Sequence, residues 1–248
     1  MMNKIQKNSK IKAVAFDLDH TLFDRYATLK LVSHDFFTEK REWLSQDMTE
    51  EKVADILIRA DAVHIVQGWS AIHKYWMDSG LLANDKDGNP KACKKELFDY
   101  VWNYGFFKHA VKYPFTNPML DELREAGYKV CLITNCAKEI GIRRQTAKLE
   151  LLDMTDKFDE IIISGQVGIH KPHRNIFDIM SWRLGIPAQN MLYVGDHPIN
   201  DVEGSKAAGY IPVWVRLREE YGESADCEYS VKDVSEIPAL ADRINSEQ

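Results

Sequence analysis

The sequence is short of cysteine and of long apolar runs, and each shortage excludes a class of protein. Four of the 248 residues are cysteine, and no two of them form a C-x-x-C pair. They are too few for a disulfide scaffold of this size and wrongly spaced for a zinc site, so we expect reduced thiols without a metal. Apolar stretches such as residues 161–163 are far shorter than the ~18 residues that cross a bilayer. No membrane partner is expected.

A secretion signal and an excess of basic residues are also missing. The N-terminal segment MMNKIQKNSK is basic, but neither a long apolar region nor a small-residue cleavage pattern follows it. We therefore expect no signal peptide and a cytoplasmic location. Lysine and arginine number 32 against 38 aspartates and glutamates, a formal net charge of −6. Because binding to nucleic acid requires a basic face, no nucleic-acid partner is expected.

The sequence does contain a regular alternation of strand and helix patterns. Short apolar, β-rich runs occupy residues 11–16, 128–135, 159–165, 190–196 and 210–215. Helical patterns lie between them, at residues 117–126, 138–150, 173–184 and 199–208. Strands that alternate with helices indicate a parallel sheet covered on both faces. The predicted fold class is α/β, a doubly wound, Rossmann-like parallel sheet.

One connection is far too long for this alternation. The first predicted strand ends near Asp17 and the second starts near Tyr128, whereas most connections in α/β units have ~2 to 6 residues. The apolar residues of the intervening segment recur three or four apart, as in helices. The segment also holds 13 basic and 13 acidic residues, so the net charge lies in the rest of the chain. We predict an inserted helical cap domain over residues 25–112 and an α/β core formed by residues 1–24 and 113–248.

Polar residues end the predicted strands or lie in the loops beyond them. They are Asp17, Asp19, Thr134, Asn135, Lys171, Asp196 and Asp201. In open α/β sheets the ligand site lies outside the carboxyl ends of the strands, so these side chains are expected to converge. Four carboxylates in one place repel one another unless a cation neutralises them. A hard, oxygen-liganded ion is implied, and Mg²⁺ best fits a site that leaves room for water and a phosphate.

The choice of nucleophile follows from the motifs that are absent. The sequence has no G-x-S-x-G elbow, no Walker A loop and no G-x-G-x-x-G. A carboxylate can itself attack phosphorus and form an aspartyl-phosphate, and Asp17 at the strand end is the predicted nucleophile. Asp19 is the predicted acid and base, and Lys171 is expected to compensate the charge of Asp17. Thr134 and the backbone amides that open the 138–150 helix are expected to hold phosphoryl oxygens.

The sequence resembles the haloacid dehalogenase superfamily in four motifs, which occur in the order DLDHTL (17–22), ITN (133–135), HKP (170–172) and GDHPIND (195–201). The resemblance implies a Mg²⁺-dependent phosphohydrolase with a helical cap between its first two motifs. It implies that Asp17 is the nucleophile and that Asp19 is the acid/base and a backbone-carbonyl metal ligand. It also implies that Asp196 binds the metal directly and Asp201 lies in its outer shell. The second motif-one aspartate points to the phosphatase branch, whose usual substrates are small phosphomonoesters such as nucleotides, glycolate phosphate or sugar phosphates.

Other interpretations stay open at this point. A phosphosugar mutase would use the same aspartyl-phosphate, and a non-enzymatic receiver module also carries an acidic cluster, a threonine and a lysine. Asp196 or Asp201 could instead cap the 199–208 helix. Four histidines adjoin the motifs, and we expect capping, surface or substrate-rim roles for them rather than zinc binding: His20, His170, His173 and His197. The sequence leaves the substrate open, as well as the choice between monomer and homodimer.

Overall fold

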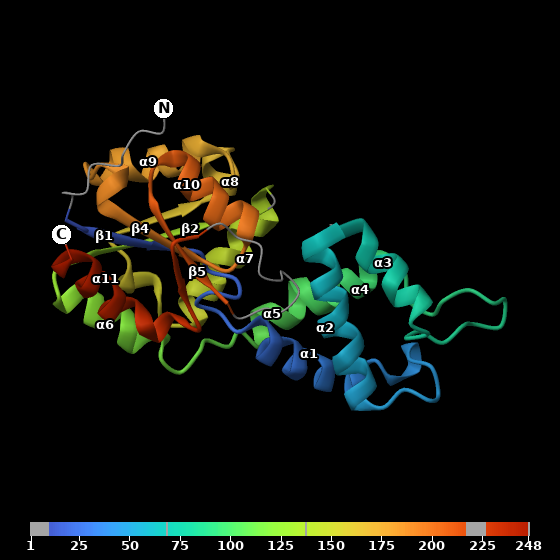
Figure 1. The fold of residues 1–248 in the computed structure, drawn as a ribbon. Coiled ribbons are helices and arrows are strands. Elements are labelled where there is room, and N and C mark those ends of the chain that lie inside the picture. Colours follow the sequence, from blue (N-terminus) through green and yellow to red (C-terminus); the bar gives the residue numbers. More distant parts are fainter. Residues whose placement is uncertain (1–9, 68, 137, 217–226, 248) are drawn as a thin grey trace. The chain divides into compact units, whose positions relative to one another are not determined.

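The chain forms two compact units in a computed structural model that describes residues 10–67, 69–136, 138–216 and 227–247 (Figure 1). The first unit consists of Met1–Asp24 and Lys112–Gln248, and the second of Arg25–Val111. The sheet belongs to the first unit, and the second is helical. Among the residues that the structure describes, no helix has both the length and the hydropathy needed to span a membrane.

The sheet of the first unit is entirely parallel. Its described strands are β1 (Ala13–Phe16), β2 (Lys129–Thr134), β3 (Glu160–Ile163), β4 (Met191–Gly195), β5 (Ile211–Val215) and β6 (Tyr229–Val231). They are ordered β3-β2-β1-β4-β5-β6. The predicted fold class is confirmed, because β1 to β5 lie in the five predicted runs. The sixth strand was not predicted, since three residues of mixed burial are too few to show a pattern.

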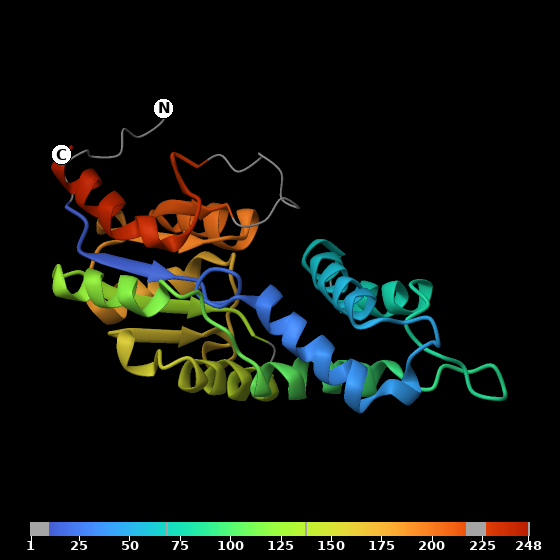
Figure 2. The same cartoon turned by 90° about the horizontal axis from the view of Figure 1, so that it is seen from below.

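Helices cover both faces of this sheet. α9 (Arg174–Leu184) and α10 (Gly204–Ala208) lie on one face (Figure 1). α6 (Thr116–Glu125) and α11 (Ile237–Ser246) lie on the other, the side from which Figure 2 views the sheet. Every residue of β1 is fully buried, as a strand covered on both faces requires.

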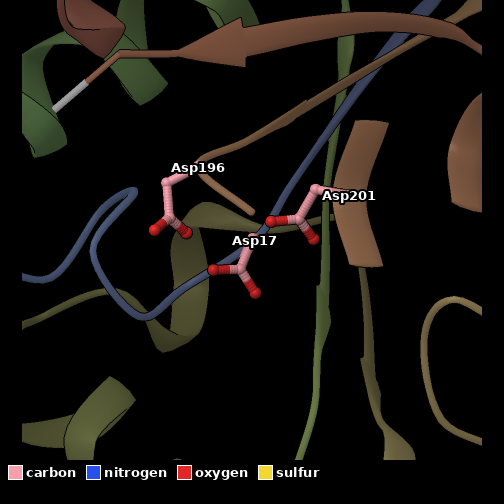
Figure 3. Close-up of side chains that lie close together, drawn as sticks. All are labelled: Asp17, Asp196 and Asp201. Atoms are coloured by element: carbon pink, nitrogen blue, oxygen red, sulfur yellow. The ribbon is translucent and has the colours of Figure 1, made fainter. Parts of the chain in front are cut away.

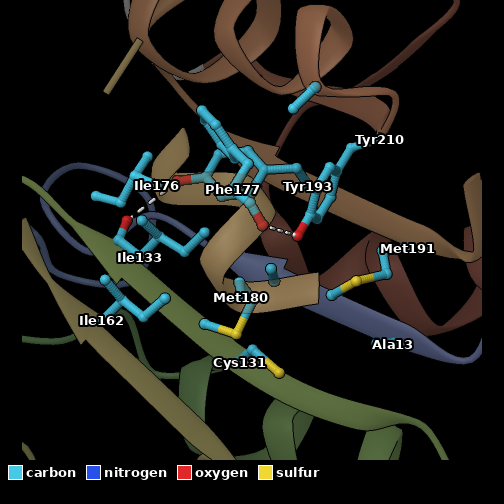
Figure 4. Packing of buried hydrophobic residues seen from close by; sticks show 12 residues of the cluster. Ala13, Cys131, Ile133, Ile162, Ile176, Phe177, Met180, Met191, Tyr193 and Tyr210 are labelled. Atoms are coloured by element: carbon cyan, nitrogen blue, oxygen red, sulfur yellow. Dashed lines mark hydrogen bonds between the residues drawn. The ribbon is translucent and has the colours of Figure 1, made fainter. Parts of the chain in front are cut away.

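The hydrophobic core beneath α9 is formed by alternate residues of three strands. Odd-numbered positions of β1, β2 and β4 point to this face, because successive side chains of a strand alternate in direction. They are Ala13, Ala15, Cys131, Ile133, Met191 and Tyr193. Ile176, Phe177 and Met180 of α9 pack on them at helical spacing (Figure 4). Two tyrosine hydroxyls in this core donate hydrogen bonds to main-chain carbonyls. Tyr193 donates to the carbonyl of Ile133, and Tyr210 donates to the carbonyl of Phe177.

Two predicted elements differ in detail from the structure. Residues 159–165 were predicted as one strand, but the chain turns after Ile163 into the short helix α8 (Ser164–Val167). Residues 199–208 were predicted as one helix, but a π-helical turn (Pro198–Glu203) precedes α10. His197 caps that turn, because its Nδ1 accepts hydrogen bonds from two backbone amides 3.2 Å away. This cap explains why the element begins one residue earlier than predicted.

The second unit is built from helices. They are α1 (Arg25–Glu39), α2 (Glu50–Gln67), α3 (Trp69–Asp78), α4 (Lys94–Phe98), a π-helical segment (Asp99–Gly105) and α5 (Phe106–Lys108). A buried ion pair between Arg25 of α1 and Asp61 of α2 joins the first two helices. The Arg25 guanidinium also lies over the ring of Phe106, 4.9 Å from its centroid.

Candidate active site

Three aspartates converge at the carboxyl ends of two neighbouring strands (Figure 3). Asp17 follows β1, Asp196 follows β4, and Asp201 lies on the π-helical turn just beyond. One ligand oxygen from each lies within 4.8 Å of the others, and all three residues are buried. The Asp17 amide donates to the carbonyl of Val194 at 2.9 Å, so the parallel pairing of β1 and β4 sets the separation of these residues.

Lys171 places its ammonium among these carboxylates. The Nζ atom lies 2.6 Å from Asp17 Oδ1, 2.7 Å from Asp201 Oδ1 and 2.9 Å from the hydroxyl oxygen of Tyr193. Burial lowers the pKa of Lys171, but the charges of Asp17 and Asp201 outweigh that effect and hold the pKa well above its usual value. The lysine therefore stays charged and offsets one of the nearby negative charges.

The electrostatics of the cluster favour a cation. Burial, together with Asp201 and Asp19, raises the pKa of Asp17 from 3.8 to about 7, against the lowering effect of Lys171. The single ammonium of Lys171 offsets at most one of the three negative charges that these carboxylates can carry. Oxygen ligands in this number and charge suit a hard divalent cation, and the buried aspartates could bind one.

Asp19 is not one of the three grouped aspartates, but its charge helps to raise the pKa of Asp17. Its oxygens accept hydrogen bonds from Gln145 at 2.8 Å and from Lys148 at 2.6 Å, both on α7 (Lys138–Leu151). The Asp19 side chain is 22% exposed, against 10% for Asp17. The chain reverses immediately afterwards at His20, whose φ of 65° is left-handed.

Thr134 and Asn135 lie at the end of β2, where the sequence placed them. The Thr134 hydroxyl is buried and accepts a hydrogen bond from Gln145 at 2.8 Å. The Asn135 side chain binds the backbone of Lys171 twice, accepting from its amide at 2.8 Å and donating to its carbonyl at 2.9 Å. Asn135 thus fixes the segment that carries the lysine. Residue 137, before the backbone amides predicted to hold phosphoryl oxygens, lies outside the described residues.

Sequence reasoning missed three polar residues of this site: Tyr193, Gln145 and Lys148. No sequence signal indicated Tyr193, because tyrosine is a common residue in apolar strands. Gln145 and Lys148 are three residues apart on a predicted helix, so they share a face. That spacing was a usable signal, but the sequence could not show that this face is buried. The expected capping role is confirmed for His173, which accepts from the amide of Asn175 at 3.2 Å.

Comparison with known proteins identifies the family. A family model described as haloacid dehalogenase-like hydrolase matches residues 14–215. The chain belongs to the haloacid dehalogenase-like hydrolase family.

Curated relatives of this haloacid dehalogenase-like hydrolase are phosphatases. A glyceraldehyde 3-phosphate phosphatase from Methanopyrus kandleri is 30% identical over 83% of this chain and 84% of its own length. A ribulose-1,5-bisphosphate 5-phosphatase from Halopiger xanaduensis is 29% identical over 86% and 89%. The resemblance seen in the four motifs and the prediction of a phosphatase of this family are both confirmed.

Solved structures agree on the fold. The magnesium-bound structure of a putative haloacid dehalogenase-like hydrolase from Bacillus subtilis, YfnB, aligns with a TM-score of 0.70 at 18% identity, over 94% of this chain and 99% of its own. A predicted phosphoglycolate phosphatase from Haemophilus somnus aligns with a TM-score of 0.66 at 19% identity, over 94% and 99%. At these identities the likeness shows that the haloacid dehalogenase-like fold is shared.

Proposed function

We propose that the protein is a Mg²⁺-dependent phosphomonoesterase that acts on a small phosphorylated metabolite through an aspartyl-phosphate on Asp17. The observation that carries this proposal is the position of Asp17, at a strand end, 2.6 Å from the ammonium of Lys171 and grouped with Asp196 and Asp201. The curated relatives support the substrate class, because they are named for small phosphorylated metabolites, including glyceraldehyde 3-phosphate and phosphoserine.

In the first step a carboxylate oxygen of Asp17 bonds to phosphorus while the bond from phosphorus to the leaving oxygen breaks. Asp19 gives its proton to that leaving oxygen. In the second step Asp19 takes a proton from water, whose oxygen attacks the same phosphorus and releases Asp17 and inorganic phosphate. Asp17, Asp196 and Asp201, with the main-chain carbonyl of Asp19, would hold Mg²⁺, which supplies positive charge to the phosphoryl oxygens.

The remaining chain contributes fixed charge and position. The ammonium of Lys171 offsets charge on Asp17 and on the phosphoryl group as the new bond forms. Asn135 keeps that ammonium in place by binding the Lys171 backbone on both sides of its α-carbon. We further propose that the unit Arg25–Val111 is the cap that selects the substrate and that the other unit is the catalytic core. A cytoplasmic location, and a monomer or homodimer, stay predictions.

The test is a screen of the purified protein for release of inorganic phosphate. The panel contains nucleotides, sugar phosphates, phosphoglycolate and phosphoserine, each with and without Mg²⁺. We expect turnover of at least one of them that requires Mg²⁺ and is abolished by Asp17→Asn. The matched control is Asp178→Asn on the exposed side of α9, which removes the same charge and should leave the rate unchanged. A rearranged sugar phosphate without free phosphate would favour the mutase, and full activity of Asp17→Asn would contradict the nucleophile.

A further inference from the structure

One face of α7 contacts Asp19, the proposed acid/base. Gln145 and Lys148 lie one turn apart on this helix, and both are buried, at 4% and 5% exposure. Residues three apart on a helix project to the same side. Glutamine and lysine are uncommon in protein interiors without polar partners, so two of them together on a buried face indicate a specific use.

Lys148 forms an ion pair with Asp19 in which the lysine is more deeply buried than the aspartate. Its Nζ atom lies 2.6 Å from Asp19 Oδ1 and 4.8 Å from the centroid of the Phe23 ring. The lysine side chain is 6% exposed, whereas the aspartate side chain is 22% exposed. The ammonium is therefore enclosed, while part of the carboxylate remains accessible to a ligand.

Gln145 holds the second oxygen of the same carboxylate. Its Nε2 atom donates to Asp19 Oδ2 at 2.8 Å, to Thr134 Oγ1 at 2.8 Å and to the carbonyl of Asn135 at 3.2 Å. Two donors on a single helix thus bind the two oxygens of Asp19 separately. This arrangement fixes the rotation of the carboxylate and ties it to the end of β2.

We propose that Gln145 and Lys148 are positioning residues that aim the carboxylate of Asp19 at the leaving oxygen of the substrate. The proposal rests on the proposed function, because it assumes that Asp19 transfers the proton. The proposal depends on geometry, because a displacement of about 1 Å at a reacting group can slow a reaction by roughly 100-fold. A purely structural ion pair would not alter the reaction of one kind of ester more than another.

The experiment compares two kinds of substrate. Proton donation matters for an alkyl phosphate, whose leaving oxygen is strongly basic, and little for 4-nitrophenyl phosphate. We expect Lys148→Met to lower kcat/KM for an alkyl phosphate by roughly 10-fold or more, and for 4-nitrophenyl phosphate by far less. Arg143→Met removes a positive charge from the exposed face of α7 and should change neither value. Lys148→Arg should restore part of the rate on the alkyl ester.

A double-mutant cycle tests whether the effect passes through Asp19. In the Asp19→Asn background, Lys148→Met should cost less than about 2-fold, because the group that it positions no longer transfers a proton. Equal losses in the two backgrounds, or equal losses for the two esters, would overturn the proposal. If Lys148→Met does not fold, Gln145→Leu carries the same comparison.

The failure of this proposal can be told apart from the failure of the proposed function. Absence of phosphate release from the wild-type protein counts against the function alone. The positioning role is then judged from crystal structures of the wild type and of Gln145→Leu. Reorientation of the Asp19 carboxylate in the variant supports it, and an unchanged carboxylate overturns it.

Discussion

Asp201 packs directly against the backbone of Gly195: a Cβ atom on Gly195 would lie 2.4 Å from the carboxylate carbon of Asp201. That separation is far shorter than any van der Waals contact. The Asp201 carboxylate can therefore reach Lys171 only because position 195 has no side chain. The glycine of the GDHPIND motif thus has a steric role in the site.

We expect Gly195→Ala to displace Asp201 and weaken its 2.7 Å contact with Lys171. A shift of about 1 Å in the cluster should lower kcat by roughly 100-fold. Phosphate release by the purified variant measures the effect, and circular dichroism verifies the fold. Activity within a factor of two of wild type would show that the turn can move without consequence for the site.

Tyr193→Phe should impair catalysis more than it impairs folding. The ring would keep its edge-on contact with Phe177, but the hydroxyl that accepts from Lys171 and donates to the carbonyl of Ile133 would be lost. Loss of these hydrogen bonds should cost about 1 kcal/mol of unfolding free energy. Because the lysine loses one of its acceptors, we expect kcat to fall as well, with little change in KM.

The control for this variant is Tyr210→Phe. Tyr210 belongs to the same core cluster, and its hydroxyl lies 2.8 Å from the carbonyl of Phe177, away from the lysine. It should lose a similar amount of stability, about 1 kcal/mol, and keep the wild-type kcat. Equal values of kcat in the two variants would exclude a role for the Tyr193 hydroxyl in placing Lys171.

Mg²⁺ should stabilise the protein by RT ln(1 + [Mg²⁺]/Kd), about 2.7 kcal/mol at a hundredfold excess over Kd. Asp196→Asn removes one negative charge from the cluster and one ligand from the ion. This variant should melt at or above the wild type without metal and gain little when Mg²⁺ is added. Calorimetry at fixed ionic strength provides the comparison, and Asp178→Asn should respond as the wild type does. Equal Mg²⁺-induced shifts in wild type and Asp196→Asn would remove Asp196 from the metal site.

Removal of residues 25–111 should leave a folded α/β unit. Phe23 and Lys112 pair across the two connections, and the Thr116 hydroxyl donates to the carbonyl of Leu22 at 3.1 Å, so a short Gly-Ser bridge can join Asp24 to Lys112. All strands of the described sheet lie outside the deletion. We expect cooperative melting, loss of substrate discrimination and at most slow hydrolysis of aryl phosphates. Native selectivity in the shortened protein would place specificity in the core loops.

Several features of this protein are encoded locally and were predictable from the sequence. Buried parallel strands are continuous apolar runs, so β1 to β5 were visible one by one. Residues at the ends of those strands, or in the segments just beyond them, lie at one edge of the sheet, so the sequence predicted that Asp17, Asp19, Thr134, Lys171, Asp196 and Asp201 converge. The structure groups Asp17, Asp196 and Asp201 and places Lys171 against Asp17. Strand β6 was not predicted, because three residues are too few to show an apolar run or an alternation.

The tertiary structure alone decided which polar groups meet inside that site. Gln145 and Lys148 contact Asp19 across 126 and 129 residues of chain, and no periodicity within α7 specifies that partner. The role of Gly195 is equally invisible in the sequence, because it arises from the distance between a backbone and a side chain six residues on. Periodicity reports which side of an element is buried. Packing between elements determines what that side touches, and so it determined the surroundings of Asp19, Lys171 and Asp201.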